Sequence, residues 1–168
     1  MPLFYIPDNV LGHQCVGTEN PWAVITYGTC KPMKDFGLKY DQDGLPLISE
    51  CNKNSFVRYF QTPEFLSAFE MLYQNKNGLQ DKFVAYWDKV SSYFANNDYV
   101  IGYDPINEPY PSNYMLDPTI VTETGKFDRT LLQPMYTRLY EVYRKYSSKK
   151  IMFFEPGQFP DAIGIDGG

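Results

Sequence analysis

Hydrophobic side chains recur at helical spacing in two long stretches of the chain. The stretches are LQDKFVAYWDKVSSYFANN (residues 79–97) and LQPMYTRLYEVYRKYSSKK (residues 132–150). In each, apolar residues are three or four positions apart, which places them on one face of a helix. They are Leu79, Phe83, Trp87, Val90 and Phe94 in the first stretch, and Leu132, Met135, Leu139, Val142 and Tyr146 in the second. Both stretches are therefore predicted to be amphipathic helices.

A third helix is predicted where the chain reads TPEFLSAFEMLYQNKNG (residues 62–78). Thr62 has the side chain of an N-cap residue, and Pro63 suits the first helical position because its missing N–H has no partner there anyway. Gly78 is the expected end of this helix.

Each of the two long helices is followed by a short apolar run that predicts a buried strand. YVIGYDPIN (residues 99–107) follows the first helix, and IMFF (residues 151–154) follows the second. Continuous apolar runs of this length are typical of parallel strands that are buried on both faces. The order helix, strand, helix, strand predicts an α/β fold with two neighbouring parallel strands.

The first third of the chain differs from the rest. Residues 1–61 are rich in Pro and Gly and predict irregular structure, apart from a strand-like run at Trp22–Tyr27. Residues 62–168 carry the helix and strand patterns. We expect residues 1–168 to belong to one domain, with a loop-rich segment before its helices and strands.

Composition indicates a folded protein and excludes some classes of partner. The 168 residues are 43% hydrophobic and 21% charged, as in globular domains. The net charge is −5 and the chain has no block of basic residues, so its composition argues against binding to nucleic acid. The chain has no apolar run long enough to predict a membrane span and no signal-peptide pattern at its start, so the compartment stays open, as does the oligomeric state.

Cysteine and histidine usage predicts neither a metal site nor a cofactor. The three cysteines are Cys15, Cys30 and Cys51, without a CxxC pair, and the one histidine is His13. No metal-ligand spacing is present. The cysteines are consistent with one disulfide and a thiol, or with three reduced thiols.

The chemistry-bearing residues stand where the two predicted strands end. Asn107, Glu108 and Pro109 follow the first strand, and Glu155 follows the second. In α/β barrels the residues at the C-terminal ends of the strands form the active site. Carboxylates in such a place, in a chain that is 17% aromatic, suit glycoside hydrolysis, where one carboxyl protonates the leaving oxygen. Aromatic side chains are equally expected in a packed core.

GYDPINEP (residues 102–109) resembles the signature of one known family. Three stretches extend the resemblance: HQCVGTENPWAV, NGLQDKFVAYWDKVSSYFANNDYVIGYDPINEPYP and LQPMYTRLYEVYRKYSSKKIMFFEP. Together they are similar to the endoglycoceramidase branch of the family 5 glycoside hydrolases. The resemblance implies part of a (β/α)8 TIM barrel, with two to three βα units and parallel strands, beginning just after strand three.

The resemblance also implies roles for individual residues. Glu108 matches the general acid/base of a retaining glycosidase, and Asn107 matches its neighbour, which hydrogen-bonds the sugar 2-hydroxyl. Tyr110 and Glu155 are expected in the substrate pocket. The family's nucleophile follows a later strand, so Glu155 is not assigned that role, and the chain by itself is expected to be inactive. The implied substrate is a carbohydrate, with a glycolipid preferred over a cellulose-like β-glucan, and a secreted or lysosomal parent enzyme is expected.

Two other interpretations remain open from the sequence. One is a small α/β module that binds carbohydrate without cleaving it. The other is a fragment from a truncated gene model that has no stable fold, since two strands leave both sheet edges open.

Overall fold

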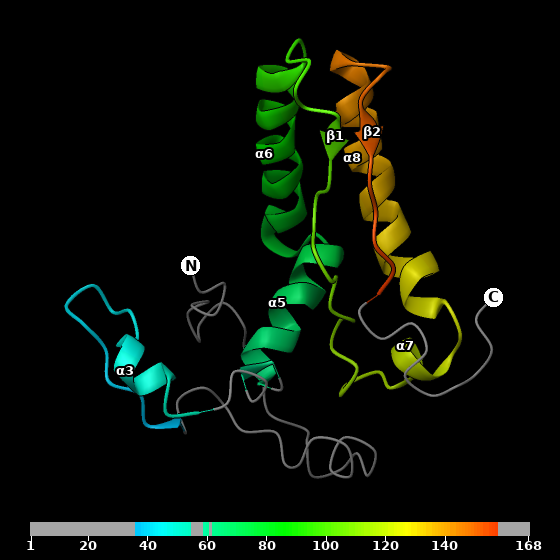
Figure 1. Ribbon diagram of the computed structural model, residues 1–168. Coiled ribbons are helices and arrows are strands. Elements are labelled where there is room, and N and C mark those ends of the chain that lie inside the picture. Colours follow the sequence, from blue (N-terminus) through cyan, green and yellow to red (C-terminus); the bar gives the residue numbers. More distant parts are fainter. Residues whose placement is uncertain (1–35, 55–58, 61, 158–168) are drawn as a thin grey trace. The chain divides into compact units, whose positions relative to one another are not determined.

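The computed structural model describes residues 36–54, 59–60 and 62–157, which fall into two units (Figure 1). Within the described residues, the first unit comprises residues up to 69 together with residues 113–117. The second comprises residues 70–112 and 118–157. The predictions for Cys15, Cys30, His13 and the run Trp22–Tyr27 lie outside the described residues.

The first unit contains a short helix that the sequence did not predict. Helix α3, Ile48–Cys51, is a single turn closed by the Cys51 amide, which donates to the Leu47 carbonyl at 3.0 Å. The turn before it is fixed by Asp41, whose carboxylate accepts from the amides of Asp43 and Leu45, each at 2.9 Å. The prediction of irregular structure throughout residues 1–61 is wrong here, because local hydrogen bonds organise a stretch that lacks hydrophobic periodicity. Cys51 is a free thiol.

Helix α5, Pro63–Tyr73, begins as the sequence predicts. The Thr62 hydroxyl accepts from the Phe65 amide at 3.2 Å and donates to the Tyr59 carbonyl at 2.8 Å, which confirms the N-cap. The helix ends at Tyr73 rather than at Gly78, because Asn75 and Asn77 adopt left-handed φ angles of 53° and 55°. A 3₁₀ turn, η2 (Lys76–Gly78), then leads into the next helix.

The second unit is built on two long helices that pack side by side (Figure 1). They are α6, Leu79–Phe94, and α8, Gln133–Tyr146; α8 continues a π-helical turn, η3 (Asp128–Leu132), and a short helix α7 (Thr119–Thr122) precedes that turn. Four of the five residues of the second predicted stripe are buried, namely Leu132, Met135, Leu139 and Val142, whereas Tyr146 is 38% exposed. Among the described helices, none combines the length and the apolar character that crossing a membrane requires.

Polar contacts join the two long helices at their edges. Arg138 on α8 donates to Gln80 and to Asp81 at the start of α6. Near the other end, the Lys145 ammonium lies 3.1 Å from the Asp88 carboxylate. Exposed ion pairs of this kind contribute little to stability, so the apolar stripe of α8 does most of the packing.

The two strands form a parallel pair, as the sequence predicts. Strand β1 is Gly102–Tyr103 and strand β2 is Ile151–Met152, with Gly102 opposite Ile151 and Tyr103 opposite Met152. The Phe153 amide extends the ladder by donating to the Tyr103 carbonyl at 2.9 Å. The predicted order of helix, strand, helix, strand is confirmed, although both strands are shorter than the apolar runs that predicted them.

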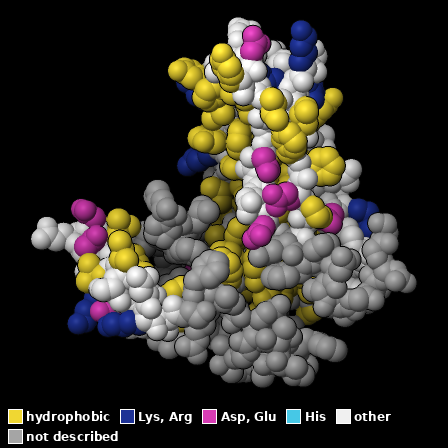
Figure 2. Space-filling model, in the orientation of Figure 1, with side chains coloured by type: hydrophobic (Ala, Val, Ile, Leu, Met, Phe, Trp, Pro, Cys, Tyr) yellow, Lys and Arg dark blue, Asp and Glu magenta, His cyan; other side chains and the backbone are white. Residues whose placement is uncertain are grey.

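The strands are not buried on both faces, which corrects the prediction. Tyr103 lies in the core against Trp87 of α6 and Tyr143 of α8. The exposed apolar side chains of the two strand segments are Ile101 (68% exposed), Ile151 (51%), Phe153 (41%) and Phe154 (72%). The two long helices cover Tyr103 but leave these four side chains exposed, and Figure 2 shows hydrophobic side chains exposed on this unit.

Candidate active site

The site begins at the C-terminal end of β1, where Glu108 has an unusual backbone conformation. Its φ angle is +46°, in the left-handed region. For a residue with a Cβ atom this conformation costs about 1–2 kcal/mol, so something must hold it. Glu108 is itself exposed, while the neighbouring Pro109 is fully buried and anchors the loop.

The group that contacts the Glu108 backbone comes from the end of β2. The Glu108 amide donates to the Oε2 atom of Glu155 at 2.6 Å. Parallel pairing places the ends of β1 and β2 at the same edge of the sheet, which is why residues 47 positions apart meet. The structure therefore brings together the two glutamates that the sequence singled out.

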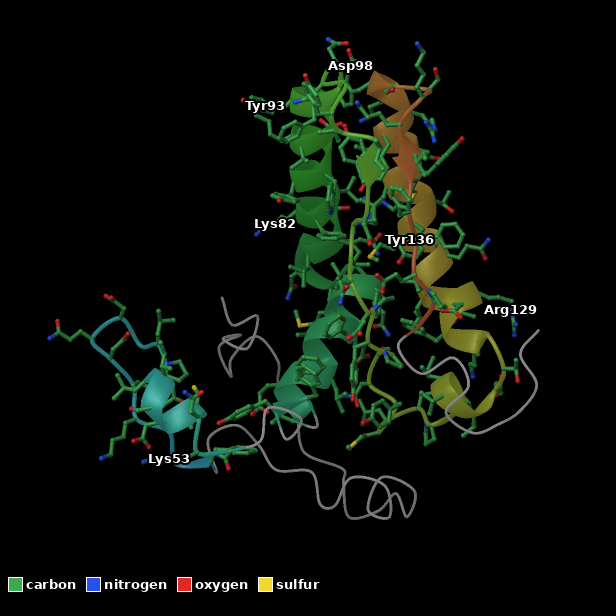
Figure 3. The ribbon with its side chains drawn as sticks, in the orientation of Figure 1. Lys53, Lys82, Tyr93, Asp98, Arg129 and Tyr136 are labelled. Carbon is green, nitrogen blue, oxygen red and sulfur yellow. The ribbon has the colours of Figure 1, made fainter. Side chains whose placement is uncertain are left out.

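Glu155 is in turn fixed by Tyr136, which Figure 3 labels on α8. The Tyr136 hydroxyl donates to the Glu155 carbonyl at 3.0 Å and accepts from the Glu155 amide at 3.2 Å. One hydroxyl thus satisfies both backbone groups of the residue that contacts Glu108. The Tyr136 ring also meets the Phe154 ring edge-on, with centroids 6.1 Å apart.

Two further contacts fix the loops around this pair. The Gly157 amide donates to the Asp128 carboxylate at 2.8 Å, which attaches the chain after β2 to the start of η3. The Tyr73 hydroxyl donates to the Tyr110 carbonyl at 2.9 Å, which holds the loop after Glu108. The segments that follow the two glutamates are therefore held by Tyr73 and Asp128, which belong to the same unit.

The remaining residues singled out by the sequence have different surroundings. Asn107 is exposed next to Glu108. Tyr110 is only 3% exposed, so the structure buries its ring and presents its carbonyl to Tyr73. A substrate contact by either residue stays a prediction.

Acidic groups make the electrostatic field of the site negative. Burial, and then the charge of Glu155, raises the pKa of Asp104, and the amide of Ile106 opposes this shift. Burial also raises the pKa of Tyr136, with Asp104, Glu155 and Asp128 adding to the shift against the hydrogen bond to the Glu155 backbone. Tyr136 therefore keeps its proton at neutral pH and remains a hydrogen-bond donor. Figure 2 shows acidic side chains gathered on this unit.

Within residues 36–54, 59–60 and 62–157, no group of three or more His, Cys, Asp or Glu side chains is arranged to hold a metal ion. The chemistry that the described residues offer is that of carboxyl groups, amides and one tyrosine hydroxyl.

Sequence reasoning missed Tyr136, Asp104 and Asp128 as parts of this site. Tyr136 follows Met135 on the helical stripe and reads as an ordinary boundary position. Asp104 stands two residues after Gly102, so strand alternation places both on the face of the sheet opposite Tyr103. This alternation was the signal in the sequence that could have identified Asp104. Nothing in the local pattern connects Asp128 with Gly157.

Comparison with known proteins gives a consistent result, although no protein-family model matches the chain. An endoglycoceramidase from Hydra vulgaris is 35% identical over 145 residues, and one from Cyanea nozakii is 31% identical over 147 residues. In both cases the match covers 84% of this chain and 28% of the relative. The chain is related to the endoglycoceramidases. The predicted resemblance to this branch of the glycoside hydrolases is thereby confirmed.

Among solved structures, the crystal structure of an endogalactoceramidase is similar, with 26% sequence identity and a TM-score of 0.48. That match covers 68% of this chain and 24% of the solved one. This chain thus spans less than a third of the length of each endoglycoceramidase relative.

Proposed function

We propose that this chain forms a central part of the barrel of a retaining glycosidase that cleaves a glycolipid, with Glu108 as its general acid/base. One observation carries the proposal: Glu108, at the C-terminal end of β1, has a left-handed backbone whose amide is held by Glu155 from the end of the neighbouring parallel strand. Strained backbone conformations of non-glycine residues occur preferentially at functional sites. The relationship to endoglycoceramidases supplies the reaction class.

In this reaction Glu108 first protonates the glycosidic oxygen as a second carboxylate attacks the sugar, and it then removes a proton from the water that releases the product. Exposure of the Glu108 side chain suits a group that must reach a substrate. Asn107 donates an amide hydrogen bond to the sugar 2-hydroxyl, and Tyr110 belongs to the substrate pocket. Glu155 lines the pocket beside Glu108.

The attacking carboxylate is proposed to lie outside this chain. Retaining enzymes place two carboxyl groups roughly 5–5.5 Å apart across the scissile bond. Glu155 is not chosen, because its carboxylate is already bonded to the Glu108 amide. The chain by itself is therefore proposed to be inactive.

The partial-barrel proposal is supported by the open side of β2. Beside β2 and α8 lies a groove of about 990 Å³, lined mainly by apolar surface that includes Leu132, Tyr140 and Met152. In a (β/α)8 barrel this is the place of the next βα unit. Residues 62–168 are proposed as the helix–strand–helix–strand part of the barrel, and residues 1–61 as the loop-rich segment that follows strand three.

A glycolipid is preferred over a β-glucan because the two curated relatives are endoglycoceramidases. Exposed aromatic side chains near the strand ends, including Phe154, offer apolar surface to such a substrate.

The test is Glu108→Gln in the full-length enzyme that contains this chain. Activity on a glycolipid, which has a poor leaving group, should fall by roughly 10²–10⁴-fold, and activity on an activated aryl β-glycoside should fall much less, because a good leaving group needs little protonation. The matched control is Glu141→Gln, at an exposed position of α8. Equal losses on both substrates would remove Glu108 from the acid role.

A second arm tests the inactivity of the chain by itself. Residues 1–168 alone should not cleave the activated aryl glycoside. Cleavage that disappears in Glu155→Gln, with the fold intact, would instead make Glu155 the nucleophile.

A further inference from the structure

Glu155 has a more specific task than lining a pocket, as its hydrogen bond to Glu108 indicates. The acceptor is an ionisable carboxylate and the donor is a backbone amide, 2.6 Å apart. Charge-assisted bonds of this kind are about twice as strong as neutral ones. The bond lies at the residue whose φ of +46° is unfavourable, so it stabilises the conformation that directs the Glu108 side chain.

A carboxylate can position a neighbour only if its own backbone is fixed. The residues around Glu155 have few apolar anchors, since Phe154 and Pro156 are exposed. Tyr136 supplies the fixed point by bonding both the carbonyl and the amide of Glu155. Two residues after Glu155, the Gly157 amide donates a hydrogen bond to the Asp128 carboxylate. The end of β2 is thus attached to the N-terminal part of the η3–α8 segment at two places.

Tyr136 is well suited to this task because α8 is firmly packed at this point. Its neighbour Met135 is fully buried, as is Leu139 one turn further on. The Tyr136 hydroxyl keeps its proton among three acidic residues, so it can donate and accept at once. The chain of contacts runs from the core of α8 through Tyr136 and Glu155 to the backbone of Glu108.

We propose that Tyr136 and Glu155 are positioning residues for the general acid/base. Glu155 holds the Glu108 backbone through its carboxylate, and Tyr136 holds the Glu155 backbone through its hydroxyl. Neither residue transfers a proton to the substrate or attacks it. This inference rests on the proposed role of Glu108.

Hydrogen exchange of the Glu108 amide tests the geometry without any activity measurement. In the full-length enzyme, Tyr136→Phe should speed exchange in the peptide covering residues 106–112 by roughly tenfold. Without the Tyr136 hydroxyl, the Glu155 carboxylate is no longer held where it accepts from the Glu108 amide. Tyr140→Phe is the matched control: the same substitution on α8, at a half-exposed residue whose ring stacks on Arg144. Equal exchange in the two variants overturns the proposal.

Two substitutions of Glu155 separate its hydrogen bond from its charge. Glu155→Gln retains an oxygen that can accept from the Glu108 amide, whereas Glu155→Met fills similar space without an acceptor. We expect fast exchange in Glu155→Met and slow exchange in Glu155→Gln. Fast exchange in both would also support the proposal, with the bond depending on the charged carboxylate, whereas slow exchange in both would overturn it.

Kinetics then distinguish positioning from substrate binding. Tyr136→Phe and Glu155→Met should lower kcat on the glycolipid by roughly tenfold with little change in KM, and should affect an activated aryl glycoside much less. The Gln variant should retain most of the activity. A rise in KM with unchanged kcat would make Glu155 a substrate-binding residue and overturn its positioning role.

The Glu108→Gln result separates the two levels of the argument. If Glu108→Gln shows the leaving-group dependence and the Tyr136 and Glu155 variants behave like Tyr140→Phe, the positioning inference alone fails. If Glu108→Gln has no effect on the glycolipid, the proposed acid/base fails, and the positioning roles fail with it.

Discussion

Gly102 lies so close to Ile151 that a Cβ atom at position 102 would clash with the Ile151 carbonyl oxygen. The Phe153 ring would be 2.9 Å from the same Cβ. The obstacle is backbone of the paired strand, which cannot move aside as a flexible side chain could. The register of β1 on β2 therefore depends on the absence of a side chain at this position.

Gly102→Ala should consequently destabilise the protein by about 3 kcal/mol, at the upper end of the usual cost of overpacking. Urea unfolding provides the measurement. Gly37→Ala is the control, because a Cβ atom at position 37 meets no atom within 4 Å. Its expected cost is only the backbone strain of a φ of +63°, which is about 1 kcal/mol. Similar losses at both positions would show that the strand contact is not tight.

The left-handed backbone of Glu108 predicts that glycine is favourable at that position. Glu108→Gly should be about 0.5–1 kcal/mol more stable than Glu108→Ala, because glycine adopts this conformation without a Cβ penalty. The same pair of substitutions at Glu141, inside α8, should give the opposite order by about 1 kcal/mol. Thermal unfolding of the four variants decides the matter, and the same order at both positions would contradict the assigned conformation.

Lys150 predicts an effect on stability far from the glutamates. It is buried, and its ammonium donates to the carbonyls of Asn97 and Val100, both at 2.6 Å. These bonds join the segment before β2 to the connection between α6 and β1. Lys150→Met should cost about 1–3 kcal/mol, because two carbonyls lose a charged donor.

The neighbouring Lys149 offers a control for Lys150, since it is exposed. Lys149→Met should change the free energy of unfolding by less than about 0.5 kcal/mol. If both variants unfold at the same urea concentration, the Lys150 bonds do not contribute to stability.

Asp104 predicts a pH dependence of stability. Its pKa is raised in the folded protein, first by burial and then by Glu155. The folded state therefore binds the proton more tightly than the unfolded chain, and stability falls as the pH rises from about 3.9 through the raised folded value. Above that window the ionised carboxylate is unfavourable.

Asp104→Asn should thus raise the melting temperature at neutral pH, and the gain should disappear below pH about 4, where the carboxyl is protonated in both states. Thermal melts across the pH range measure this. The control is Asp98→Asn, at an exposed position between α6 and β1. A gain of the same size at every pH would exclude the titration of Asp104 as its cause.

Local sequence patterns were sufficient to predict the two long helices and the order of helices and strands after residue 78. The stripe of Met135, Leu139 and Val142 is a local pattern, because side chains three or four positions apart must share a helix face. The N-cap at Thr62 is likewise set by residues within one turn of each other. The alternation of helices with short apolar runs was sufficient to predict a parallel pair, and Asn107-Glu108-Pro109 marked the end of its first strand.

The groups that contact Glu108 could not be predicted from the sequence, because they depend on tertiary packing. The bond from its amide to Glu155 requires the register of Gly102 on Ile151, and the two bonds from Tyr136 require α8 to lie beside the end of β2. No local pattern specifies such contacts, because they depend on the packing of segments that are distant in sequence. The same reason explains the exposed Ile151 and Phe154: an apolar run predicts burial, but only neighbouring elements on each face can provide it.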